Sequence, residues 1–294
     1  MIFLKKFLLV FILTAALTMS GYGCSAKNKP NEDSEAIAAT SQPYTERDVP
    51  SASGNYVYDE KNVLSAEDKK AVNDYAEWLY KEKLINSAVI ITDDIRQKAP
   101  LDYTVERFNE IYEGKGSGLI ILINNDTKED IVYKTGSCYA NIDDTSQNNA
   151  MFWSTKETVN GDLRKGIMRL LQLGEICPLH IIDNAQVFDS NKIAALEKSL
   201  ASCKKEMTLI ASRNGSAQSN EDILKNYYKR KYSDSEGIML MIDTNKKTII
   251  AYSEGRIAKE LESALKEADS LVSKEDYYGA AGKAIEALGG KMND

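Results

Sequence analysis

Histidine is nearly absent from this sequence of 294 residues, which contains only His180. A single histidine excludes a zinc site built from several imidazole ligands. It also excludes Ser-His-Asp and Cys-His triads from the first half of the chain, where no histidine occurs. A lone histidine at the front of a predicted strand is usually structural, so the sequence gives little support to catalysis that depends on histidine.

Other chemical signatures are missing as well. The sequence has no G-x-S-x-G elbow, no Walker loop and no G-x-G-x-x-G turn. It also has no excess of basic residues, because 37 Lys and Arg stand against 44 Asp and Glu, for a net charge of −7. Proteins that bind nucleic acid normally carry a basic patch, so we predict no nucleic-acid partner.

One long apolar run occurs, from Phe7 to Met19, directly after Lys5 and Lys6. It is short for a bilayer span and no stop-transfer pattern follows, so residues 1–23 are predicted to be a signal peptide. Cys24 then stands where a lipoprotein carries its lipid, and residues 24–54 have the composition of a flexible tether. We expect a lipid-anchored protein on the extracytoplasmic face of the cell membrane; the alternative is a secreted protein.

Cysteine is scarce. Beyond Cys24 the chain has Cys138, Cys177 and Cys203, so at most one disulfide can form among them. Their spacing does not suggest a metal site, and the simplest interpretation is that they are small buried residues.

An internal repeat organises the rest of the chain. Residues Gly118 to Gly136 align without a gap with Gly237 to Gly255, and each copy has an apolar run, a polar turn and a second run containing a tyrosine. Such a run predicts a strand covered on both faces, and the turn predicts a hairpin. Helical patterns lie between the strands, so the fold class is predicted to be α/β. We expect two tandem three-layer α/β/α sandwich domains, 55–177 and 178–290, each with a small mixed sheet ending in a β-hairpin.

Four short motifs stand out in the first copy: Val57, Asp59, Val63, Leu64 and Ser65; Ile90 to Thr92; Gly118 to Ile123; and Gly161, Asp162 and Gly166. Together they resemble the motifs of the TPM domain family. The resemblance covers roughly residues 55–175 and, more weakly, residues 180–290. That family comprises exported bacterial and thylakoid-lumen α/β/α domains, some described as metal-binding and some as acid phosphatases. The hairpin of the first copy lacks the family's common G-x-G, since Ser137 and Cys138 follow Gly136.

Carboxylates follow the predicted strands of the first copy. Asp59, Asp93, Asp94 and Asp126 belong to the edge where parallel strands end, and Asp143 and Asp144 could reach it from a later loop. Ligands favour this edge, and converging carboxylates suit Ca²⁺ or Mg²⁺. The alternative is that the same residues only stabilise turns. In the second copy, Arg213 is expected to lie near Asp183 and Asp243 and to replace the cation.

A second cluster, Tyr227 to Lys231, ends a predicted helix with two tyrosines and three basic residues. It is either a contact for another protein or a solvated helix end. We therefore expect an extracytoplasmic binding or envelope-maintenance protein whose first domain can bind a divalent cation. Its partner would be an unknown envelope protein or a small ligand. The alternative is a divalent-metal-dependent acid phosphatase.

Overall fold

The computed structural model describes residues 47–289 except 216–217, 233–234 and 255–257. The predicted signal peptide, Cys24 and most of the predicted tether lie outside the described residues. The residues described from 47 onward all belong to one compact unit. In this part of the chain, none of the helices is long and apolar enough to cross a membrane.

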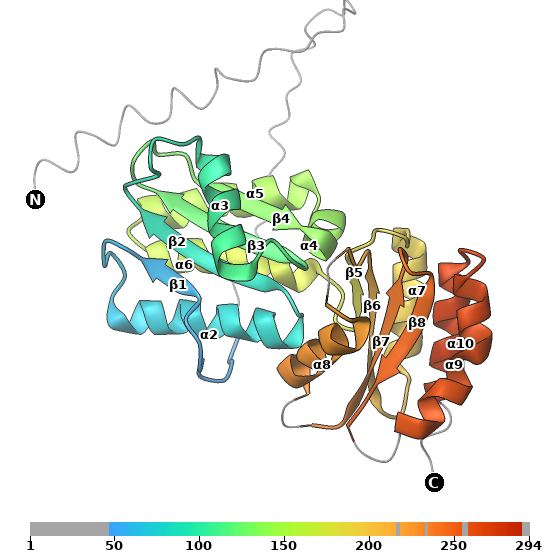
Figure 1. The fold of residues 1–294 in the computed structure, drawn as a ribbon. Helices are drawn as coiled ribbons and strands as arrows, with labels where there is room; N and C mark the ends of the chain where they lie inside the picture. The colour runs from blue at the N-terminus through green and yellow to red at the C-terminus, as the bar shows by residue number, and fades with distance from the viewer. Residues whose placement is uncertain (1–46, 216–217, 233–234, 255–257, 290–294) are drawn as a thin grey trace, which may run out of the picture. The chain divides into compact units, whose positions relative to one another are not determined.

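The first sheet contains four strands in the order β1-β2-β3-β4 (Figure 1). They are Val57–Asp59, Asn86–Thr92, Gly118–Asn124 and Ile131–Thr135. The first three are parallel, with Val57 opposite Val89 and Val89 opposite Ile121. β4 returns antiparallel to β3 and completes the predicted hairpin.

The second sheet repeats this arrangement with β5-β6-β7-β8. Its strands are Ile181–Asp183, Glu206–Ser212, Gly237–Asp243 and Thr248–Tyr252. Three are again parallel, and β8 is antiparallel to β7. The predicted fold class, two small mixed sheets that each end in a hairpin, is therefore confirmed.

Helices cover both faces of each sheet. In the first half, Val89 and Ile91 pack in one core with α2 (Ala66–Glu82) and α6 (Leu163–Leu171). The alternate residues Ala88 and Ile90 pack in the other core with α3 (Pro100–Tyr112). Successive strand residues point to opposite faces, so an unbroken apolar strand requires helices on both sides.

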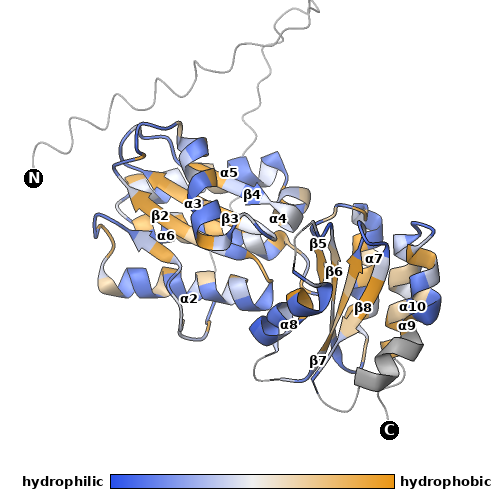
Figure 2. Ribbon diagram, in the orientation of Figure 1, coloured by the Kyte–Doolittle hydropathy of each residue, from blue (hydrophilic) through white to orange (hydrophobic). Residues whose placement is uncertain are grey.

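The second half follows the same rule. One core joins its sheet to α7 (Ser190–Ala201), α9 (Ala258–Val272) and α10 (Tyr277–Gly289). The other core joins the sheet to α8 (Asn220–Lys231). Figure 2 shows the central strands β2, β3, β6 and β7 largely in the hydrophobic colour, whereas the helices mix hydrophilic and hydrophobic residues.

Three helices begin directly after a side chain that caps them. The Ser65 hydroxyl accepts from the Asp68 amide at 3.1 Å, the Ser219 hydroxyl from the Asp222 amide at 3.1 Å, and the Asp189 carboxylate from the Lys192 amide at 2.9 Å. Each bond satisfies an amide that the helix itself leaves without a partner.

The region after β4 contains helices and not the loop expected around Asp143 and Asp144. It forms α4 (Gly136–Asn141) and α5 (Asp144–Val159), and a 3₁₀ turn, η1 (Gln172–Ile176), follows α6. α5 packs on α6, and Ser154 is its only buried residue in the described structure. A helix that buries so little has no apolar stripe, which is why its sequence lacks helical periodicity.

Candidate functional site

The aspartate at the end of β1 stabilises a turn. Asp59 is 7% exposed, and its carboxylate accepts from the amides of Val63 at 3.1 Å and Leu64 at 3.0 Å. Asp183 at the end of β5 does the same with Val187 at 3.2 Å and Phe188 at 2.8 Å. Burial raises the pKa of Asp183. The same bonds in both halves indicate that this aspartate shapes the strand-to-helix connection.

The other carboxylates at the first edge are exposed. Asp93 forms an ion pair with Lys61 at 2.7 Å, and both side chains are about half exposed, at 45% and 47%. Asp94 accepts from the Arg96 amide at 2.8 Å. Asp126 is exposed on the hairpin turn, where its amide donates to the Asn124 side chain at 3.0 Å. These groups share one edge of the sheet, but each belongs to its own turn.

Asp143 and Asp144 lie elsewhere, and the expectation that they reach this edge is wrong. Lys134 is paired with Leu119 near the start of β3, and its ammonium donates to the Ile142 carbonyl at 2.8 Å. The Asp144 carboxylate is 4.0 Å from that ammonium. Five residues of β3 separate this end from the other, which is about 16 Å along a strand. Asp143 caps α5 by accepting from the Ser146 amide at 2.6 Å.

The described residues contain no group of three or more His, Cys, Asp or Glu side chains positioned to hold a metal. Asp59 uses both carboxylate oxygens on backbone amides, and Asp93 is paired with a lysine. As arranged, these oxygens do not fit a Ca²⁺ or Mg²⁺ site. Cation binding at this edge therefore remains a prediction that a binding measurement must test.

The expectation for Arg213 is also wrong. Its side chain is exposed, and within the described ranges no carboxylate oxygen lies within 4.0 Å of its guanidinium. Asp183 is occupied by the turn described above. One oxygen of Asp243 accepts from the amides of Asn245 at 3.0 Å and Lys246 at 3.2 Å. Arg213 instead lines a pocket.

This pocket has a volume of about 480 Å³ and lies at the carboxyl end of β6. Residues of both halves line it, including Tyr80, Lys115 and Gly136 from the first and Asn184, Arg213 and Arg230 from the second. The lining residues include three cationic side chains and no aspartate or glutamate. The whole chain has a net charge of −7, but the lining of this pocket is positive. A positive pocket attracts anions.

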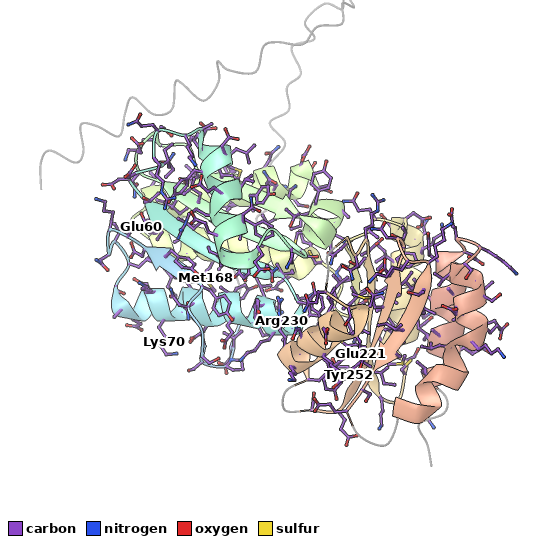
Figure 3. All side chains as sticks on the ribbon, in the orientation of Figure 1. Glu60, Lys70, Met168, Glu221, Arg230 and Tyr252 are labelled. Carbon is purple, nitrogen blue, oxygen red and sulfur yellow. The ribbon has the colours of Figure 1, made fainter. Side chains whose placement is uncertain are left out.

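Arg230 projects from the last turn of α8 (Figure 3). Its Nε donates to the Tyr80 carbonyl, its Nη1 donates to the Asn86 side chain at 2.9 Å, and its guanidinium carbon is 3.3 Å from the centre of the Tyr80 ring. The Nη2 atom is buried without a hydrogen-bond partner in the described structure. Burial lowers the pKa of the guanidinium. A buried cation without a counter-ion is costly, and an anion in the pocket would relieve that cost.

The neighbouring Lys231 is more deeply buried than Arg230, with its side chain 1% exposed. Its ammonium donates to the carbonyls of Glu82 at 3.0 Å and Leu179 at 2.8 Å. The basic end of α8 therefore contacts the carboxyl end of α2, where carbonyl groups lack helical partners. The cluster Tyr227 to Lys231 was expected to be either a solvated helix end or a contact for another protein. A solvated helix end is wrong for Arg230 and Lys231, because both side chains contact the first half of the same chain.

Two glycines allow the halves to approach each other at the pocket. A Cβ atom on Gly136, whose φ is +55°, would lie 2.5 Å from the Asn184 side-chain oxygen. A Cβ atom on Gly116, whose φ is +76°, would lie 3.0 Å from the Tyr227 hydroxyl. A larger residue at either position would need a strained backbone and would move a pocket residue.

Not every basic group at the pocket is free to bind a ligand. Lys115 forms an ion pair with Glu113 at 2.5 Å, which offsets its charge. The two guanidiniums of Arg213 and Arg230 have no such partner among the described carboxylates. His180 is engaged apart from the pocket, with its Nδ1 3.0 Å from Glu197, so it has the structural role expected of a lone histidine.

The pocket was not predicted from the sequence. Its residues come from segments far apart in the chain, up to 150 positions for Tyr80 and Arg230. The only local signal was the basic run that includes Arg230, together with the run Ser212 to Gly215 directly after a predicted strand.

Comparison with known proteins gives one family. The family model described as the TPM domain matches residues 57–151. A search of curated proteins found no match. Among solved structures, this chain is similar to the solution structure of the N-terminal domain of a protein from P. gingivalis. The two are 17% identical, the alignment covers 45% of this chain and 90% of the other, and the TM-score is 0.38. The matched residues include β1, α2, β2, α3, β3 and β4, which carry most of the predicted resemblance, whereas Gly161, Asp162 and Gly166 lie outside the match. Residues 57–151 of this chain are therefore a TPM domain.

Proposed function

We propose that this protein is an extracytoplasmic binding protein and that its ligand occupies the pocket between Arg213 and Arg230. The observation that carries the proposal is the composition of the pocket, in which guanidinium and amide side chains are present and carboxylate, imidazole and thiol groups are absent from the described lining. Such a set can hold a ligand but offers no general base beside a nucleophile.

The ligand class follows from the same residues. Arginine presents a planar set of donors that matches phosphate and carboxylate groups. A volume of about 480 Å³ is within the range of pockets for small molecules. The tyrosine rings of Tyr80 and Tyr227 add apolar surface. The ligand is therefore a small molecule that carries a phosphate or carboxylate group.

The location is part of the proposal. The predicted signal peptide, the lipid site at Cys24 and the tether of residues 24–54 together support a membrane-anchored protein outside the cytoplasm. The TPM domain is consistent with this location, because the family is one of extracytoplasmic and lumenal domains.

Calorimetric titration with inorganic phosphate, a phosphomonoester and a dicarboxylate tests the binding function. Arg213→Ala should weaken binding of the preferred anion at least about tenfold, because it removes a charge-assisted contact at an exposed position where folding is not affected. Lys229→Ala is the matched control, since Lys229 is exposed on α8 and does not line the pocket. Equal affinities in wild type and Arg213→Ala would refute the proposed site.

A metal-dependent phosphatase is the second candidate. It takes its support from Asp59, Asp93, Asp94 and Asp126, which share one edge of the TPM domain, although their oxygens as arranged do not fit a cation. Turnover of a phosphomonoester with Mg²⁺ or Ca²⁺, lost in the double variant Asp93→Ala with Asp94→Ala, would support it. Turnover that does not depend on metal, or that survives the double substitution, would exclude it.

A further inference from the structure

Two buried cysteines of the first half are in direct contact. Cys138 lies in α4, and Cys177 follows η1 at the start of the connection to β5. Their sulfur atoms are 3.6 Å apart, with the Cys177 thiol directed at the Cys138 sulfur. The side chains are 0% and 3% exposed.

The contact is specific within the chain. Both residues belong to the core formed by the first sheet with α2 and α6. Cys203, the other cysteine that the structure describes, is half-buried in the second half, where its sulfur contacts the Ser199 carbonyl at 3.4 Å. Only one pair among these three cysteines is therefore close enough to react.

The environment explains why the pair is not a reactive thiol centre in the folded protein. The hydrogen bond from Cys177 and the burial of the side chain both raise the pKa of Cys138 well above its ordinary value. A thiol in this state is a poor nucleophile, because the thiolate is the reactive form. It can nevertheless be oxidised while the chain is still folding and its thiols are accessible.

We propose that Cys138 and Cys177 form a disulfide in the exported protein. The reaction joins the two sulfur atoms and removes two protons and two electrons from the thiols. The electrons reduce a disulfide of an extracytoplasmic thiol oxidoreductase, or of oxidised glutathione in vitro, to two thiols. It proceeds by thiolate attack on the oxidant's disulfide and by resolution of the mixed disulfide by the second cysteine. Extracytoplasmic compartments are oxidising and therefore favour the disulfide over the two thiols.

The bond would fix the region beside the pocket. α4 begins at Gly136, and the connection after Cys177 leads to Asn184, whose side chain accepts from the Ser117 hydroxyl at 2.6 Å. The Cys177 carbonyl also accepts from the Lys83 ammonium at 2.6 Å. The crosslink would tie the helix that follows the hairpin to the segment that starts the second half, and it would close a loop of 39 residues. The crosslink between Cys138 and Cys177 does not require a bound ligand.

Peptide mass spectrometry of the full chain tests the proposal. The protein is refolded with reduced and oxidised glutathione, unfolded, alkylated without reductant and digested. We expect a crosslinked peptide pair containing Cys138 and Cys177, while Cys203 is alkylated. Alkylation of all three residues would overturn the proposal, and so would a crosslink that involves Cys203.

A melting measurement gives an independent readout. Reduction of the wild-type protein should lower Tm by about 5–10 °C, because a crosslink across a loop of this length restricts the unfolded chain. Cys203→Ser is the matched control and should lose the same increment on reduction. Cys138→Ala should show no change in Tm on reduction. An unchanged Tm for wild type on reduction would count against the crosslink.

Discussion

Arg230 contacts Tyr80 in two ways, since its guanidinium carbon lies 3.3 Å from the centre of the Tyr80 ring and its Nε donates to the Tyr80 carbonyl. The cation therefore interacts both with an aromatic face and with the carboxyl end of α2. This pair joins the second half of the chain to the first and forms part of the pocket.

Replacement of Arg230 should separate stability from binding. In Arg230→Met the apolar side chain keeps most of the volume and removes a charge that has no counter-ion, so the free energy of unfolding should change by less than about 1.5 kcal/mol. Affinity for the anion should fall about tenfold or more. Denaturant unfolding and calorimetric titration measure the two effects, with Lys229→Met as the control for loss of charge. A variant that binds like wild type would show that Arg230 has only a structural role.

Lys231 should make stability depend on pH. Burial lowers the pKa of its ammonium in the folded protein below the ordinary 10.5. Between the lowered pKa and 10.5 the unfolded chain binds more protons than the folded one, so this residue raises the free energy of unfolding as the pH increases. Urea unfolding from pH 7 to pH 10 should show this increase in wild type relative to Lys231→Met. A constant difference between the two proteins across the range would contradict the assignment.

Asp59 and Asp183 should behave alike. Each accepts two backbone amides in a buried turn, so replacement by alanine should cost about 2 kcal/mol of unfolding free energy in either half. Asp94→Ala, at an exposed position of the same edge as Asp59, serves as the control and should cost far less. A large loss of calcium response in Asp59→Ala without loss of stability would instead identify Asp59 as a metal ligand.

Asp143 and Asp144 are neighbours with different expected roles. Asp143→Ala should lower Tm because α5 loses its cap, and Asp144→Ala should leave Tm unchanged because that side chain is 99% exposed. Neither substitution should alter the response of Tm to Ca²⁺. A calcium-induced rise in Tm that either substitution abolishes would place these residues in a cation site.

Gly136→Ala tests the close approach at the pocket. Alanine combines an unfavourable φ with a Cβ that would lie 2.5 Å from Asn184, so a loss of about 2 kcal/mol is expected together with weaker anion binding. Gly161→Ala is the matched control, because φ is +92° there but no atom lies within 4 Å of the added Cβ. Its cost should be about 1 kcal/mol, from backbone strain alone, with unchanged binding.

The sequence predicts the strands and the hairpins well, because these depend on residues close together in the chain. The apolar runs Leu119 to Ile123 and Ile238 to Ile242 have the length and the flanking turns typical of strands covered on both faces. It does not predict α5, whose Asp143 serves as a cap and whose polar surface lacks an apolar stripe.

The site was harder to predict for a different reason. The direction of the parallel strands places Asp59, Asp93, Asp94 and Asp126 at one edge of the sheet. It does not show that these side chains contact different residues there and do not converge on one site. Arg230 meets Asn86 across 144 positions of sequence, and nothing local to either residue records that contact.

The position of Lys231 makes each half of the chain depend on the other. Its side chain is 1% exposed, and its ammonium donates to the Glu82 carbonyl at the end of α2 and to the Leu179 carbonyl in the connection before β5. A fragment that ends before β5 would lack the donor to the Glu82 carbonyl, and a fragment that contains only the second half would expose the ammonium. Neither half should therefore be as stable alone as it is in the full chain.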